Sequence, residues 1–218
     1  MRPRITPFLL AALLVSSYSW AQDPHFGVAL DLVIPTGGFS STTYPPTQNL
    51  PVPETKDYDL GLGAKFFISF PVDPKLAFRL EFMGQSETGQ SRAEGYESLD
   101  LRHDLFGIGA EVEVFLGTGS AYRHKGTYLL GGITADFEKF SWNSGNSYYD
   151  TYGYYDNWDS QRKSRMGVLA GLGHSFGYGG GSRFTMEAVY HKTLTNHDIN
   201  AGDPPSTDFL RLGFGWVF

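Results

Sequence analysis

The residues of this 218-residue chain that could do the most chemistry are charged side chains within otherwise apolar segments. They alternate with apolar positions, and several have glycine close by. They are Asp31, Asp59, Lys65, Arg79, Glu81, Glu111, Glu113, Glu187 and Arg211. Charges removed from water must be paired, because an isolated buried charge is too costly to keep. The set therefore predicts a network of ion pairs inside the fold, with a narrow ion-selective pore lined by the same residues as the alternative.

A second group could support hydrolysis, but its spacing argues against that chemistry. His191 stands four residues after Glu187, which along one strand is roughly 13 Å at ~3.3 Å per residue, too far for a direct hydrogen bond. With Thr193, the segment loosely resembles the active strand of the outer-membrane lipid A deacylases, where a His and a Ser two residues on act with an acid. Thr193 stands in place of that Ser, and the rest of the motif is missing. We expect no catalytic residues, and a His at a strand end near the water boundary is the favoured interpretation.

Metal and nucleotide sites are not indicated by the sequence. The six histidines show no ligand spacing, and Asp150, Asp156 and Asp159 lack the pattern of a calcium-binding loop. The absence of cysteine excludes a disulfide scaffold, a zinc ribbon, an iron–sulfur site and a thiol nucleophile. The net charge of −6 argues against nucleic acid as a partner. We expect neither a cofactor nor a resident metal.

The first 21 residues have the features of an export signal. Arg2 and Arg4 form a basic start, residues 5–15 are apolar, and Ser19-Trp20-Ala21 is a small-x-small cleavage site. The apolar run is too short to span a bilayer. We therefore expect residues 1–21 to be a removed signal peptide and residues 22–218 to form a single domain.

Downstream, apolar residues recur at every second position in eight segments, which is the pattern of strands with two unlike faces. The segments cover residues 26–34, 58–70, 76–85, 106–116, 127–140, 166–176, 184–191 and 209–218. Each approaches the length that a tilted strand needs to cross a membrane. In the fifth segment the middle is apolar on both faces, so its register stays unassigned.

The connections between these segments alternate in length. Those near 36–57, 87–99, 141–163 and 193–207 are long and polar, whereas 71–75, 117–126 and 178–182 are shorter. This is the layout of an outer-membrane barrel with both termini on the side of the short turns. A soluble barrel with its apolar face inside is the alternative, but eight strands enclose too little volume for roughly three dozen large apolar side chains. We therefore expect the apolar face to contact lipid.

The end of the chain carries a further signal. Phe218 is the last residue, and Trp216 and Phe214 precede it at every second position. This strand closely resembles the C-terminal recognition strand of bacterial outer-membrane proteins, which the barrel insertion machinery reads in that family. Together with the export signal and the alternating connections, the chain resembles small eight-stranded barrels of the OmpA, OmpX and OmpW kind. The resemblance implies an all-β, antiparallel, up-and-down transmembrane barrel in the cell outer membrane, monomeric, with periplasmic termini and with lipid and lipopolysaccharide as partners.

The third long connection has the most distinctive surface composition. Its aromatic residues are Trp142, Tyr148, Tyr149, Tyr152, Tyr154, Tyr155 and Trp158, separated by Asn, Ser, Asp and Gly. Such a mixture is typical of adaptable binding surfaces, so we expect contact with a surface glycan or with a host or partner protein. Strands that continue past the membrane, with their tyrosines in the interfacial girdle, are the alternative. Arg162, Lys163 and Arg165 follow directly, where the phosphates of lipopolysaccharide would lie.

The predicted function is a structural or cell-surface contact role without catalysis. A narrow pore for ions or small solutes is the alternative, and a lipid A-modifying hydrolase is a more distant one. The glycine-rich, paired-charge interior favours the structural role, because such an interior has its volume filled by its own side chains.

Overall fold

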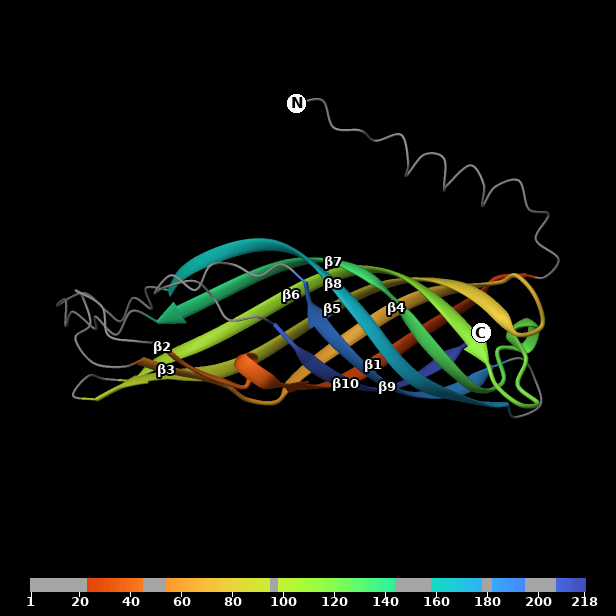
Figure 1. Ribbon diagram of the computed structural model, residues 1–218, viewed down its shortest axis with the longest axis horizontal. Helices are drawn as coiled ribbons and strands as arrows, with labels where there is room; N and C mark the ends of the chain where they lie inside the picture. The colour runs from red at the N-terminus through yellow and green to blue at the C-terminus, as the bar shows by residue number, and fades with distance from the viewer. Residues whose placement is uncertain (1–22, 45–53, 95–97, 144–157, 178–181, 195–206) are drawn as a thin grey trace, which may run out of the picture.

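The structure is a computed structural model that describes residues 23–44, 54–94, 98–143, 158–177, 182–194 and 207–218. In this part of the chain, eight long antiparallel strands close into a barrel (Figure 1). The strands are β1 (His25–Pro35), β4 (Gly61–Pro71), β5 (Leu76–Ala93), β6 (Leu99–Phe115), β7 (Gly126–Asn143), β8 (Trp158–Gly177), β9 (Arg183–Thr193) and β10 (Phe209–Val217). Each long strand pairs with the next along the chain, and β1 pairs with β10, from Gly27 opposite Val217 to Pro35 opposite Phe209, which closes the cylinder. The predicted barrel is confirmed.

Four short elements complete the described fold. Strands β2 (Ser41–Tyr44) and β3 (Glu54–Tyr58) form a ribbon that pairs onto the distal part of β5. Two single 3₁₀ turns, η1 (Gly37–Phe39) and η2 (Ala121–Arg123), lie at opposite ends of the barrel. No helix among the described residues is long and apolar enough to cross a membrane.

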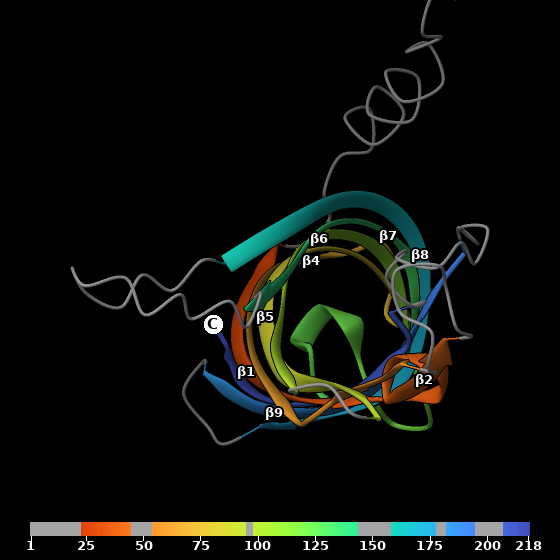
Figure 2. The same cartoon turned by 90° about the vertical axis from the view of Figure 1, so that its left-hand side faces the viewer.

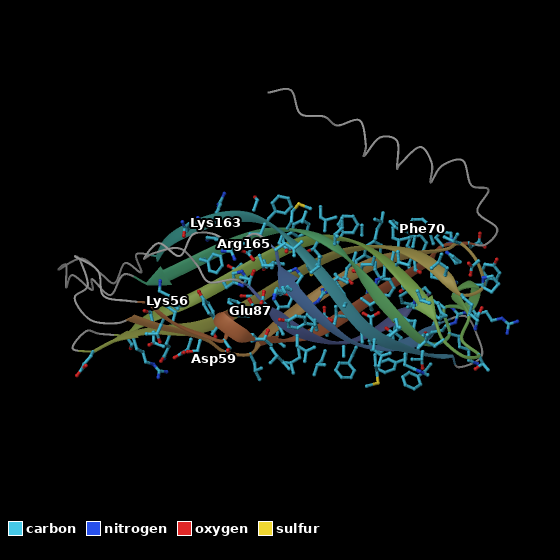
Figure 3. All side chains as sticks on the ribbon, in the orientation of Figure 1. Lys56, Asp59, Phe70, Glu87, Lys163 and Arg165 are labelled. Atoms are coloured by element: carbon cyan, nitrogen blue, oxygen red, sulfur yellow. The ribbon has the colours of Figure 1, made fainter. Side chains whose placement is uncertain are left out.

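The two faces of the strands meet different surroundings, as the alternation predicts. Leu30 and Leu62 on the outer face are 69% and 74% exposed, whereas Arg79 and Arg211 on the inner face are almost fully buried. Figure 3 shows this arrangement over the whole barrel, with apolar side chains projecting outward. The orientation inferred from interior volume is therefore confirmed.

One segment departs from the predicted alternation. The sequence pattern places Tyr58 outside and Asp59 inside, but Tyr58 is buried and Asp59 is exposed. Residues 59 and 60 are not part of a strand, and they separate β3 from β4. Tyr58 and Gly61 therefore both face inward, three positions apart, because the interruption shifts the two-residue period.

The strands are longer than predicted on one side of the barrel. Segments 87–99 and 141–163 were expected as loops, yet β5 continues to Ala93, β6 begins at Leu99, β7 continues to Asn143 and β8 begins at Trp158. β8 pairs with β7 along its length, but it pairs with β9 only from Gly167 onward. The strands β5 to β8 therefore rise beyond the rim as a curved wall, on the left of Figure 1. Ser, Gln and Gly in these segments look like loop residues, but cross-strand pairing holds them extended.

The fifth segment receives its register from its neighbours. β7 pairs with β6 and β8 along nearly its whole length, which turns Tyr128, Thr134 and Glu138 inward. Leu129 and Phe137 face outward and are about half exposed, at 47% and 48%. Apolar residues on both faces concealed this choice in the sequence, because Leu130 faces the interior beside Phe115 and Ala77.

Two interior glycines allow an aromatic ring on the neighbouring strand to lie over their backbone: Gly27 is the cross-strand partner of Phe67, and Gly173 is the cross-strand partner of Tyr128. A Cβ built on Gly27 would lie 2.1 Å from the Phe67 ring, and one on Gly173 would lie 2.3 Å from the Tyr128 ring. Neither ring has room to retreat, since Arg79 stacks on Phe67 and the Tyr128 hydroxyl donates a hydrogen bond to Glu187. Glycine is therefore required at these positions for close packing.

Gly173→Ala is expected to lower the free energy of unfolding by about 1–3 kcal/mol, because the methyl group overpacks a filled interior. The matched control is Gly84→Ala on the outer face of β5, where an added Cβ meets nothing within 4 Å. Equilibrium urea unfolding of each variant, refolded into lipid vesicles, measures its free energy of unfolding. Equal losses from the two variants would contradict this account of the inner glycines.

Candidate functional site

The centre of the barrel interior is built around Arg79, which projects inward from β5. Its Nη1 donates a hydrogen bond to Glu187 Oε1 at 2.6 Å, and its Nη2 donates one to Glu81 Oε2 at 2.6 Å. A third carboxylate, Glu113, lies 3.3 Å from Nη1. The guanidinium group also stacks on the Phe67 ring, with Cζ 3.7 Å from the ring centroid. This cation–π contact holds the Arg79 side chain in place.

Two more cations complete this central network. Lys65 on β4 contacts Glu187 Oε2 at 2.5 Å and Asp31 at 3.4 Å. Arg211 on β10 donates a hydrogen bond to Glu81 Oε1 at 2.7 Å and lies 3.9 Å from Asp31. The structure therefore brings together eight of the nine charged residues singled out in the sequence, and Asp59 lies outside the group. The prediction for Asp59 is wrong because the chain leaves the strand at that residue.

The central network holds more carboxylates than cations. Five acids (Asp31, Glu81, Glu111, Glu113 and Glu187) face three cations (Lys65, Arg79 and Arg211). Glu111 is the least engaged of the acids: its Oε2 lies 3.5 Å from Arg79 Nε, and neither oxygen accepts a hydrogen bond from the described residues. Glu111 is therefore the acid of the central network that the described residues hold least tightly.

A second cluster lies between the centre and the wall, and the sequence reading did not find it. His103 Nδ1 lies 2.7 Å from Glu87, and Arg165 Nε lies 3.0 Å from Glu138, which also accepts a hydrogen bond from Thr207. Glu87 falls in a segment expected to be loop, and Glu138 belongs to the strand without an assigned register. Only the extended strands bring these residues into the interior.

The hydrolase alternative gains no support from the geometry. His191 Nε2 lies 3.0 Å from Asp136 and 2.9 Å from the Thr134 hydroxyl, and its ring stacks on Phe209 at 4.4 Å. The Thr193 hydroxyl instead donates a hydrogen bond to the backbone oxygen of Thr207. His191 is fully buried, so the interpretation of a histidine near the water boundary is wrong. These contacts describe an interior histidine held by packing rather than a base facing a substrate.

Aromatic layers close the interior at both ends. Toward the wall, His103 lies between Phe39 of η1 and Phe140 of β7, with ring centroids 5.1 and 4.6 Å away. At the other end the turn that carries η2 folds into the ring of strands, as Figure 2 shows. There His124 is fully buried, packs against Phe115 and lies 3.3 Å from Glu113. The positive φ of His124, 42°, reverses the chain and directs this turn inward.

The surface residues singled out in the sequence are distributed unevenly. Tyr148, Tyr149, Tyr152, Tyr154 and Tyr155 lie outside the described residues, as does the signal segment 1–21. Trp142 and Trp158 belong to β7 and β8, in the wall. The chain-end residues Phe214, Trp216 and Phe218 all face outward and are 46%, 51% and 61% exposed.

The three cations after the aromatic loop do not share a surface. Arg162 is exposed, Lys163 is half-buried and Arg165 is buried in an ion pair with Glu138. Neighbouring residues on a strand point to opposite faces, so a consecutive run of charges cannot form one patch. The expectation that all three meet phosphates is therefore wrong for Arg165.

Comparison with solved structures decides the fold class. OprG, an outer-membrane protein of Pseudomonas aeruginosa, superposes with a TM-score of 0.54 at 11% identity, covering 90% of this chain and 96% of that one. The chain folds as a small outer-membrane β-barrel. Weaker similarities are to Ail of Yersinia pestis (15% identity, 89% and 96% coverage, TM-score 0.44) and to Neisserial surface protein A (13%, 89% and 95%, 0.44). No family model and no curated protein matches the sequence.

Arg79→Met is expected to destabilise this barrel by about 3–5 kcal/mol, because it leaves Glu187, Glu81 and Glu113 without their shared partner. Glu111→Gln is the matched control and is expected to cost about 1 kcal/mol or less, since this carboxyl accepts no hydrogen bond from any residue that the structure describes. Urea unfolding midpoints in vesicles compare the two. A tolerated Arg79→Met would show that the network does not hold the interior together.

Proposed function

We propose that this protein is a non-catalytic barrel of the bacterial outer membrane whose interior is closed and whose role is structural or in surface contact. The observation that carries this proposal is the filled interior, in which paired charges lie between two aromatic layers. The outer band of exposed apolar side chains supports placement in lipid, because such a surface would be unfavourable in water.

The closed interior favours this role over a pore. An ion path needs charged groups that can exchange a partner for a passing ion. Here Arg79, Lys65 and Glu187 are nearly fully buried, and Glu187 accepts a hydrogen bond from Lys65 at 2.5 Å and one from Arg79 at 2.6 Å. The η2 turn and the layer around His103 then narrow the two ends. A conducting state would require these groups to separate together.

The wall supports the surface-contact part of the proposal. β8 has β7 on one side, but over residues 158–165 no strand among the described residues pairs with its other side. Unpaired backbone donors and acceptors along such an edge can accept an extended segment of another protein. The aromatic loop joins β7 to β8 in the sequence, so the edge and the loop are neighbours along the chain.

The refolded protein is expected to give no resolved unitary steps in planar bilayer recordings, because the paired interior leaves no ion path. Arg79→Met provides the diagnostic comparison, and Lys192→Gln, an exposed change on β9, serves as the control. Unitary currents in the native protein that change with Arg79→Met but not with Lys192→Gln would establish the pore alternative instead.

Replacing the five loop tyrosines, Tyr148, Tyr149, Tyr152, Tyr154 and Tyr155, by serine is expected to reduce binding of whole cells to immobilised glycans and host cells. The loss should approach about tenfold if two or more rings make stacking contacts. Surface display of the variant, checked with an antibody to an appended epitope, controls for expression. Unchanged adhesion at equal display would remove the contact role of this loop.

A further inference from the structure

Two exposed cations lie side by side on the outer surface, at the level where the apolar band ends. Lys139 of β7 and Arg162 of β8 are direct cross-strand partners, and both side chains are exposed. Such partners have Cα atoms roughly 4.5–5.5 Å apart, so both side chains can reach one anionic group. Neither forms an ion pair within the described part of the chain. We call Lys139 and Arg162 the cationic pair.

The acidic residue nearest to the cationic pair on β6 does not neutralise it. Asp104 is the partner of Lys139 on β6, but its Oδ1 already accepts a hydrogen bond from Arg102 Nε at 2.9 Å. These four outward-facing residues together carry a net charge of +2, in a chain whose net charge is −6. The local field therefore favours an anion at this place on an otherwise acidic protein.

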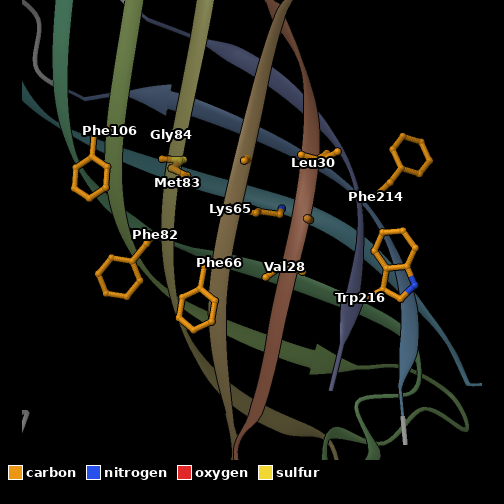
Figure 4. A pocket seen from close by; sticks show the side chains of 12 residues that line it. Val28, Leu30, Lys65, Phe66, Phe82, Met83, Gly84, Phe106, Phe214 and Trp216 are labelled. Atoms are coloured by element: carbon orange, nitrogen blue, oxygen red, sulfur yellow. The ribbon is translucent and has the colours of Figure 1, made fainter. Parts of the chain in front are cut away.

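The apolar surface just below the cationic pair is not uniform. On β7, Phe137 is the last outward apolar residue before Lys139, and it stacks with Phe106 of β6 at 6.3 Å. Phe106 also lines a groove of about 580 Å³ on the outer surface of the barrel (Figure 4). The groove forms because Ala64 and Gly84 carry little or no side chain between larger neighbours.

The groove and the cationic pair belong to one continuous surface. Phe106 is opposite Phe137, so Lys139 is its diagonal neighbour, roughly 7–8 Å away across the strands. The rings of Phe66 and Phe82, which stack at 6.5 Å, form another side of the groove. An amphiphile with an anionic head and apolar chains would match both parts at once.

We propose that Lys139 and Arg162 bind a phosphate of a phosphorylated glycolipid of the lipid A type, and that one of its acyl chains lies in the groove beside Phe106. This inference rests on the membrane placement proposed above. The cationic pair stands at the boundary between apolar and polar outer residues, which is the level of lipid headgroups rather than of bulk solution. Arg162 lies on β8, whereas the groove includes residues of β4 and β5, so one ligand must cover several strands to reach both. A lipid with several acyl chains is wide enough to do so.

The test uses the full mature barrel in nanodiscs of phosphatidylcholine containing a minor fraction of bisphosphorylated lipid A. Native mass spectrometry measures how much lipid A stays bound after release from the disc. The double variant Lys139→Gln/Arg162→Gln is expected to retain about 30-fold less, from two cations near a charged lipid surface. The matched control is Arg92→Gln/Lys192→Gln, which removes the same charge from exposed positions on β5 and β9.

Three further arms make the outcome decisive. Lipid A without phosphates should bind the native protein as weakly as bisphosphorylated lipid A binds the double variant. Excess inorganic phosphate should not displace the lipid. Gly84→Leu places a side chain in free space on the outer surface of the barrel. This side chain should fill the groove and lower the retention of bisphosphorylated lipid A several-fold.

Equal retention by the double variant and the native barrel, or equal losses in the double variant and its control, would overturn the phosphate site. Displacement by inorganic phosphate would assign a soluble anion instead. Unchanged retention in Gly84→Leu would overturn the role of the groove. Failure of the native barrel to enter nanodiscs would refute the proposed membrane function itself, which distinguishes the two failures.

Discussion

The narrow interior of an eight-stranded cylinder is the constraint on which the rest of this structure depends. Such an interior is only wide enough for side chains, so every charge placed there must find a partner across the barrel. Arg79 meets this requirement by contacting Glu81 on its own strand β5, Glu113 on β6 and Glu187 on β9. The narrow interior also explains Gly27 and Gly173, because the absence of a side chain there leaves room for the Phe67 and Tyr128 rings.

The interior and the outer surface of the barrel differ in character. Between the aromatic layers around His103 and His124, the interior holds paired charges. The wall offers polar side chains and an edge of β8 that no strand among the described residues covers. The outer face offers an apolar groove bordered by the cationic pair.

The two regions have separate origins in the fold. The wall exists because β5 to β8 extend well past the point where β9 and β10 end, so that over residues 158–165 no strand among the described residues pairs with the second side of β8. The cationic pair exists because β7 and β8 stay in register past the apolar band, which brings Lys139 and Arg162 together. Neither region would survive if the strands ended at the same level.

The sequence by itself determined the eight strands of the barrel, their antiparallel arrangement and the direction of most side chains, because a period of two records which face points outward. It did not indicate β2 and β3, which lie in a stretch expected as a connection. Of the nine charged residues that it placed inside, eight face inward, and Asp59 is the exception. Only the tertiary structure decided the rest. The break at Asp59, the inward turn of Glu138 and the strand character of Glu87 depend on backbone pairing with neighbouring strands. A one-residue shift reverses every side chain beyond it, and only hydrogen bonding to a partner fixes that shift.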